Sequence, residues 1–170
     1  MIIVEDRLKE LFATLPDITV GQNSYPVSFD FGSHRDLLRF MNSQRKAQQA
    51  VSYPLIWLET PFDRDVMRDG KINLSGLTLI LATLSDSEQS NLTRLELAFK
   101  TTLIPLSQLV LESLRKSGFT QIINDGQRKE TNFYNYGVDE TESQTTDIWD
   151  VIKIELDIIM DSKCLRCINY

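Results

Sequence analysis

Residues 147–160 read DIWDVIKIELDIIM and carry the clearest secondary-structure signal in the chain. From Ile148 to Met160 the apolar side chains occupy every second position except one, which is filled by Asp150. Charged residues take the other parity in the second half of the stretch, at Lys153, Glu155 and Asp157. An alternation of period two places such sets on opposite faces of a strand. The stretch therefore predicts a long β-strand with one buried side and one wet side.

A second long strand is predicted at residues 71–84, which read KINLSGLTLILATL and follow a turn at Asp69-Gly70. Its second half is apolar at both parities, which is typical of a strand covered on both faces. We therefore expect it at the centre of a sheet. At about 3.3 Å per residue each of the two strands would span roughly 40 Å, more than a small core requires. We expect their ends to project towards a partner.

Helices are predicted where apolar residues recur at three- and four-residue steps. One covers residues 3–15 and ends at Pro16, and a second, more polar helix covers residues 34–50 with Ser33 as its N-cap.

A third, longer helix is predicted up to Lys116, with its N-cap among residues 85–87. Pro105 lies inside this helix, so we expect a kink or a break there.

Short strands are predicted within residues 18–31 and at residues 53–60, where YPLIWLET is rich in aromatic and β-branched side chains. No internal repeat or composition shift marks a second domain. The expected fold is a single α+β domain over residues 1–170, with a mixed, mainly antiparallel sheet and helices packed on one main face. A polar hairpin or loop is expected to protrude at about residues 125–147.

Composition limits the functions to consider. The chain has 170 residues, of which 42% are hydrophobic and 25% charged, as in ordinary globular domains. Its net charge of -6 disfavours binding to nucleic-acid phosphates. The longest apolar run is far shorter than the roughly 20 residues of a membrane span, and early charges leave no secretory signal, so we expect no membrane partner.

Catalytic and metal-binding patterns are weak. Cys164 and Cys167 have the spacing of half a zinc site, but the only histidine, His34, is far away in sequence and is expected to have a structural role. No nucleophile elbow or phosphate-binding loop occurs. We expect no enzyme activity, catalytic residue, cofactor or metal site. The competing hypothesis is a metal-dependent hydrolase that binds Mg²⁺ through Asp150, Glu155 and Asp157.

Aromatic side chains within a polar segment suggest an interface. Phe133, Tyr134 and Tyr136 lie in the polar stretch 127–147, and Trp149 follows it, so these four residues are the predicted interface. The alternative is that the rings complete the core of the domain while the loop is a surface excursion.

Four stretches together give the chain a recognisable layout: YPLIWLETP, INLSGLTLILATL, IPLSQLVLESLRKSG and DIWDVIKIELDIIM. In their order the chain resembles bacteriophage tail terminator and head-to-tail joining (neck ring) proteins. The resemblance implies a structural virion protein that forms a ring, a hexamer or a dodecamer, around the DNA channel.

The resemblance also implies which partners the ring would have. These are neighbouring portal, neck or tail proteins, in a virion assembled in the host cytoplasm. DNA would pass through without specific binding, which the acidic balance suits because like charges repel. The remaining alternative is a small cytoplasmic adaptor that binds one protein partner without forming a ring.

Overall fold

The structure is a computed structural model that describes residues 3–47, 53–86, 88–123, 125–136 and 147–161. Its strands are β1 (Ile18–Val20), β2 (Asn23–Tyr25), β3 (Ser28–Gly32), β4 (Leu55–Glu59), β5 (Asp63–Val66), β6 (Lys71–Asp86), β7 (Thr120–Ile123), β8 (Lys129–Phe133) and β9 (Asp147–Asp161). Its helices are α1 (Val4–Phe12), α2 (His34–Ala47), α3 (Asn91–Arg94), the π-helical η1 (Leu95–Leu103), α4 (Ile104–Lys116) and the 3₁₀ turn η2 (Asp125–Gln127).

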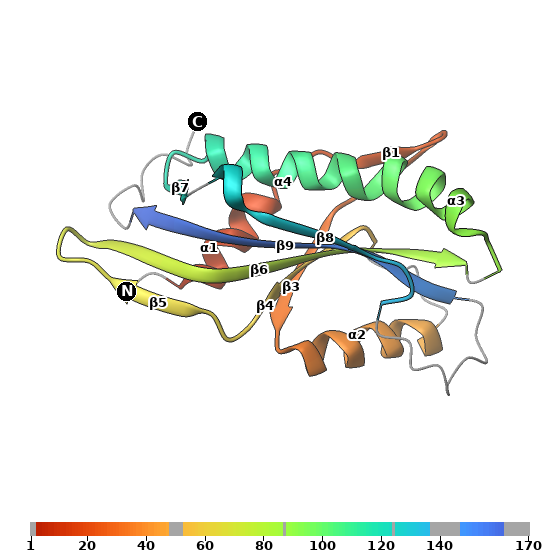
Figure 1. Cartoon of the computed structure of the whole chain (residues 1–170), viewed down its shortest axis with the longest axis horizontal. Coiled ribbons are helices and arrows are strands. Elements are labelled where there is room, and N and C mark those ends of the chain that lie inside the picture. The colour runs from red at the N-terminus through yellow and green to blue at the C-terminus, as the bar shows by residue number, and fades with distance from the viewer. Residues whose placement is uncertain (1–2, 48–52, 87, 124, 137–146, 162–170) are drawn as a thin grey trace.

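Seven strands form one sheet in the order β3-β4-β6-β9-β7, with β5 also beside β6 and β8 also beside β9 (Figure 1). β1 and β2 form a separate hairpin. The sheet is mainly antiparallel, and β3 and β4 pair in parallel. The predicted α+β class is confirmed.

The two predicted long strands, β6 and β9, lie side by side as an antiparallel pair along almost their whole length. β6 is central as expected, because β4 and β5 pair along its other edge. One register shift interrupts the pair around Gly76, whose φ of 66° lies in the left-handed region that favours glycine. The Gly76 amide donates a hydrogen bond to Asp157 Oδ1 at 2.7 Å.

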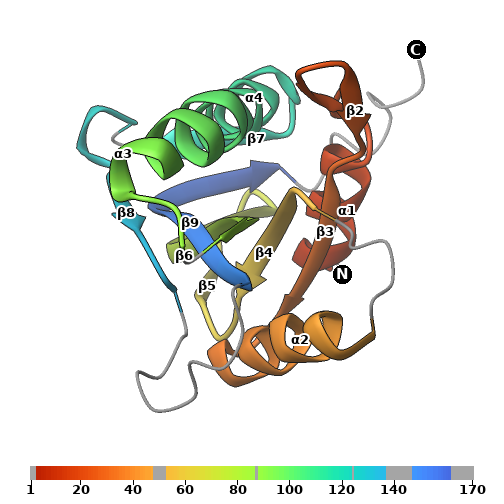
Figure 2. The same ribbon diagram turned by 90° about the vertical axis from the view of Figure 1, so that its right-hand side faces the viewer.

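The main core lies between one face of the sheet and the layer of α1, η1 and α4 (Figure 2). The even-numbered residues of β9 from Ile152 to Met160 point into it, and Leu8, Phe99 and Val110 meet them from the helices. Burying one such side chain contributes roughly 1.5–3 kcal/mol. This layer therefore supplies most of the hydrophobic stabilisation.

The long helical stretch begins later than predicted. β6 extends through Asp86 because its pairing with β9 continues that far, and the N-cap is Ser90, whose Oγ accepts the Thr93 amide at 3.2 Å. Pro105 lies in the first turn of α4, where its missing N–H costs little. The expected break at Pro105 takes the form of a change from π-helical to α-helical turns.

The expectation that the helices pack on one main face is corrected by α2, which lies against the opposite face of the sheet (Figure 2). Its Leu37 and Met41 are buried against Trp57, Trp149 and Val151. Trp149 and Val151 of β9 are apolar and point to this face, so they are covered by α2 and not by the helices on the other face. The N-cap at Ser33 is confirmed by its paired hydrogen bonds with Asp36.

The predicted excursion at residues 125–147 is partly strand. β8 pairs with β9 from Lys129 to Phe133, so this part of the segment belongs to the sheet. The remainder of the predicted excursion, residues 137–146, lies outside the described residues, as do residues 48–50 of the second predicted helix.

Candidate functional site

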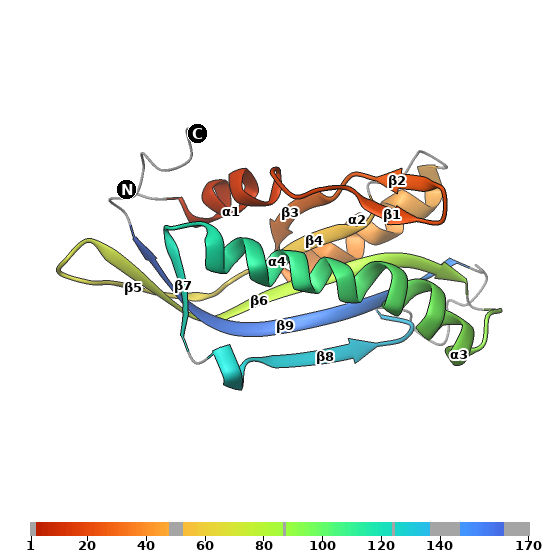
Figure 3. The same cartoon turned by 90° about the horizontal axis from the view of Figure 1, so that it is seen from above.

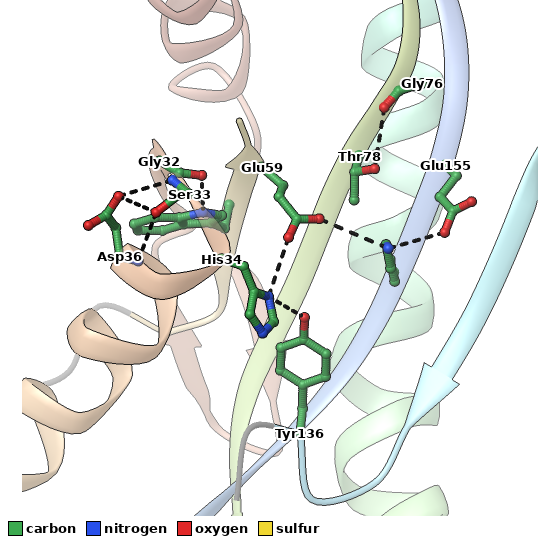
Figure 4. Close-up of polar contacts among 11 residues, drawn as sticks. Gly32, Ser33, His34, Asp36, Glu59, Gly76, Thr78, Tyr136 and Glu155 are labelled. Carbon is green, nitrogen blue, oxygen red and sulfur yellow. Dashed lines mark hydrogen bonds and ion pairs between the residues drawn. The ribbon is translucent and has the colours of Figure 1, made fainter. Parts of the chain in front are cut away.

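The candidate site is a charged area of the sheet that α2 leaves open, and we call it the polar face. It contains Glu59, Thr78 and Glu155, which stand opposite one another across β4, β6 and β9 (Figure 4). Lys153, which contacts both glutamates, completes it. Trp149 and Val151, which precede Lys153 on the same parity of β9, are apolar and are packed with Leu37 and Met41 of α2. The change from apolar to charged residues along β9 therefore marks the edge of the surface that α2 covers.

His34 joins three elements beside the polar face. The parallel pairing of β3 with β4 sets Gly32 opposite Glu59, and α2 begins two residues later, so His34 is brought close to Glu59. Its Nδ1 lies 3.3 Å from Glu59 Oε1 and 3.2 Å from the Tyr136 hydroxyl (Figure 4). Burial, and secondly the negative charge of Glu59, raise the pKa of Tyr136 to about 12. Tyr136 is therefore a neutral hydrogen-bonding group.

Lys153 connects the carboxylates of the polar face. Its Nζ lies 4.0 Å from Glu59 Oε2 and 3.2 Å from Glu155 Oε1, and Lys129 approaches Glu155 at 3.5 Å. The hydrogen bond from Lys153 is the main reason that the pKa of Glu155 is lowered. These groups are partly exposed, and exposed ion pairs contribute about 0–1 kcal/mol each. The network shapes the charge of the surface more than it stabilises the fold.

A second charged group lies on the opposite face of β9, and it is buried. Arg94 of α3 and Asp150 are 2% and 0% exposed and form a two-point ion pair. Arg94 also donates to Asn135 Oδ1 at 2.8 Å and stacks over the Tyr134 ring at 5.2 Å. The pair ties α3 to the β8–β9 hairpin. Asp150 was visible in the sequence as the one charge on the apolar parity, whereas nothing marked Arg94 as its partner.

The four predicted interface residues belong largely to the packing of the domain. Trp149 is buried, with Tyr53 4.6 Å away between ring centroids, so it is not available as a surface contact and that assignment is corrected. Tyr134 packs on Phe99 in the main core, and Phe133 and Tyr136 pack together beside α2. This placement supports the alternative in which the rings complete the core. Phe133, Tyr134 and Tyr136 remain partly exposed.

The three carboxylates of the metal-site hypothesis do not lie together. Asp150 points to the helical layer and is bound by Arg94, whereas Glu155 and Asp157 lie on the other face of the same strand. Within the described ranges, no three His, Cys, Asp or Glu side chains gather as a metal site would need. Cys164 and Cys167 lie outside those ranges.

Fold and site together define a sheet-dominated α+β protein in which the charged side chains of the candidate site are bound to one another. None of the helices in the described part of the chain is long and apolar enough to cross a bilayer. No model of a known protein family matches the sequence, and no curated protein matches it.

Proposed function

We propose that this protein is a structural subunit of a bacteriophage virion, forming a ring at the tail terminator or head-to-tail joining layer. The observation that carries the proposal is the shape of the molecule. The β5–β6 hairpin projects from one end of the long axis, well beyond the helical layer (Figures 1 and 3). A strand pair that extends past its own core is suited to contacts with neighbouring subunits.

The proposed ring is a hexamer or a dodecamer that joins portal or neck proteins to the tail. It is assembled in the host cytoplasm and acts mechanically rather than as an enzyme. The net charge of -6 supports a role around a DNA channel, because like charge disfavours tight phosphate contacts. The ion pairs of Lys153 with Glu59 and Glu155 also support this role, because a lysine that is already paired with carboxylates is less available to bind DNA phosphates.

The test is the molar mass of the purified protein by light scattering over a concentration series, with and without Mg²⁺, together with electron microscopy of mixtures with tail tubes or portals. Rings, or subunits that assemble on a tube or portal, are expected. A monomer that binds no tail tube or portal but binds one other protein would overturn the proposal in favour of an adaptor. A monomer that binds Mg²⁺ would favour the hydrolase.

A further inference from the structure

We propose that copies of this chain associate head to tail, the tip of the β5–β6 hairpin of one copy entering an apolar groove at the opposite end of the next. The inference rests on the proposed function, because it specifies the contact from which the ring is built. It names the occupant of the groove as a second copy of this chain.

The groove lies between the β1–β2 hairpin, the end of β6 and η1, and we call it the end groove. It has a volume of about 520 Å³. Apolar side chains line much of it, and three of them are also well exposed: Tyr25, Leu84 and Leu97. Contiguous exposed apolar side chains of this kind mark interaction surfaces. Leu97 is 52% exposed, and its neighbours Glu96 and Lys100 pair with each other.

The hairpin tip, residues 64–68, has the matching apolar projection. Val66 is 71% exposed and Met67 is 38% exposed, so two exposed apolar side chains lie where β5 ends and the turn to β6 begins. The turn is held by the Met67 amide bonding to Lys71 O at 2.8 Å and the Gly70 amide bonding to Met67 O at 3.1 Å. A turn that is already formed loses little conformational entropy when it enters a groove.

Charge supports the same pairing. Val66 and Arg64 share one face of β5, because they stand opposite Ile72 and Leu74 of β6. Within the described residues neither Arg64 nor Arg68 has an ion-pair partner. Among the described residues, the carboxylate of Asp86, which lines the end groove, and that of Glu88, whose amide donates to Asp86, have no cation partner either. The tip also carries Asp65, so residues 64–68 hold two arginines against one carboxylate, a net charge of +1. This positive tip complements an acidic groove rim.

The positions of tip and groove decide the type of assembly. The turn between β5 and β6 lies at one end of the long axis, and the elements that line the end groove, the end of β6 and the β1–β2 hairpin, lie towards the other end in two perpendicular views (Figures 1 and 3). One chain cannot satisfy its own groove, and a contact between two different patches generates a closed ring or an open filament. The arrangement supports a ring more directly than a symmetric dimer.

The first test compares Val66→Glu and Leu97→Glu with Phe31→Glu as the matched control. Phe31 is 45% exposed and belongs to neither the tip nor the end groove. Each of the first two variants is expected to weaken self-association at least about tenfold in sedimentation velocity, while the control is unchanged. Circular dichroism and urea unfolding check that all three remain folded. Equal association of all variants and the parent chain would overturn the inference.

The second test mixes Val66→Glu with Leu97→Glu in equal amounts. One variant keeps an intact groove and the other an intact tip, so the mixture is expected to form two-chain species and nothing larger. A mixture that stays monomeric, or one that restores full assemblies, contradicts tip-in-groove association.

The outcomes separate this inference from the proposed function. If the parent chain forms rings that all variants also form, the inference fails and the ring proposal stands. If association depends on both the tip and the end groove but the product is an open filament that joins no tail or portal component, the inference stands and the ring proposal fails.

Discussion

Two charged clusters lie on opposite faces of β9, and they differ in burial and therefore in how much each contributes to stability. Asp150 meets Arg94 inside the helical layer, while Glu155 meets Lys153 and Lys129 on the polar face. The first pair is 2% and 0% exposed, and in the second Glu155 retains 34% of its side-chain exposure. A buried charge that loses its partner pays a desolvation penalty that water cannot relieve. The same interaction chemistry is therefore structurally decisive on one face and nearly neutral on the other.

The largest expected effect follows from removing one charge of the buried pair. Asp150→Asn keeps the size of the side chain but leaves Arg94 buried without a counter-charge, and we expect a loss of about 3–5 kcal/mol of unfolding free energy. Urea unfolding measures it, with Glu155→Gln as the control on the same strand. A loss below about 1 kcal/mol would show that Arg94 reaches water in the folded protein.

Removing both charges sharpens the comparison. In Arg94→Met with Asp150→Leu no charge is left at this buried position, so we expect about 2–4 kcal/mol of the single-variant loss to be recovered. A double-mutant cycle over the two sites gives the coupling energy. Additive losses would mean that the pair's value lies in its contacts with Asn135 and Tyr134 rather than in charge compensation.

A smaller effect is expected for Tyr136. Its burial is intermediate between that of the Arg94–Asp150 pair and that of the exposed charges, because it is half-buried at the edge of the polar face. Its pKa is raised from 10.0 to about 12, chiefly by burial. The folded protein therefore holds the phenolic proton more tightly than the unfolded chain. Its contribution is fully present below pH 10 and is lost as the pH rises through about 12.

We expect this loss to be on the order of 1–2 kcal/mol, and Tyr136→Phe to remove that part of the pH dependence. Urea unfolding of both proteins at a series of alkaline pH values measures the difference. Parallel profiles for the two proteins would contradict a shielded phenol at this position.

Local patterns predicted the long strands and the helix cap at Ser33, because alternation and capping chemistry are properties of neighbouring residues. The same patterns missed α2 on the second face, since the apolar parity of Trp149 and Val151 does not say which distant element covers it. They also placed Trp149 at an interface. A buried tryptophan and an interface tryptophan have the same sequence signal, and only tertiary packing distinguishes them.

The site was predictable in part for the same reason. Asp150 broke the apolar alternation of its strand, and a charge at a core position implies a paired charge. Its partner comes from a helix far away in sequence, beyond any local pattern. The approach of His34 to Glu59 depends on the parallel register of β3 with β4, which propensity does not encode.

The smallest effect is expected on the polar face. Glu155→Gln removes a carboxylate from a partly exposed network, and because water replaces the lost partner we expect a change within about 0.5 kcal/mol at neutral pH. The lowered pKa of Glu155 means that its contribution is present above the unfolded pKa and is lost as the pH falls through the folded one. The difference between the parent and Glu155→Gln should therefore shrink in acid, as measured by urea unfolding at neutral and acidic pH.

The difference between the parent and Glu155→Gln should also shrink in high salt, whereas the loss in Asp150→Asn should persist, because salt screens exposed charges and not a pair enclosed by the helical layer. A salt-insensitive loss at Glu155 as large as that at Asp150 would abolish the distinction between the two faces of β9.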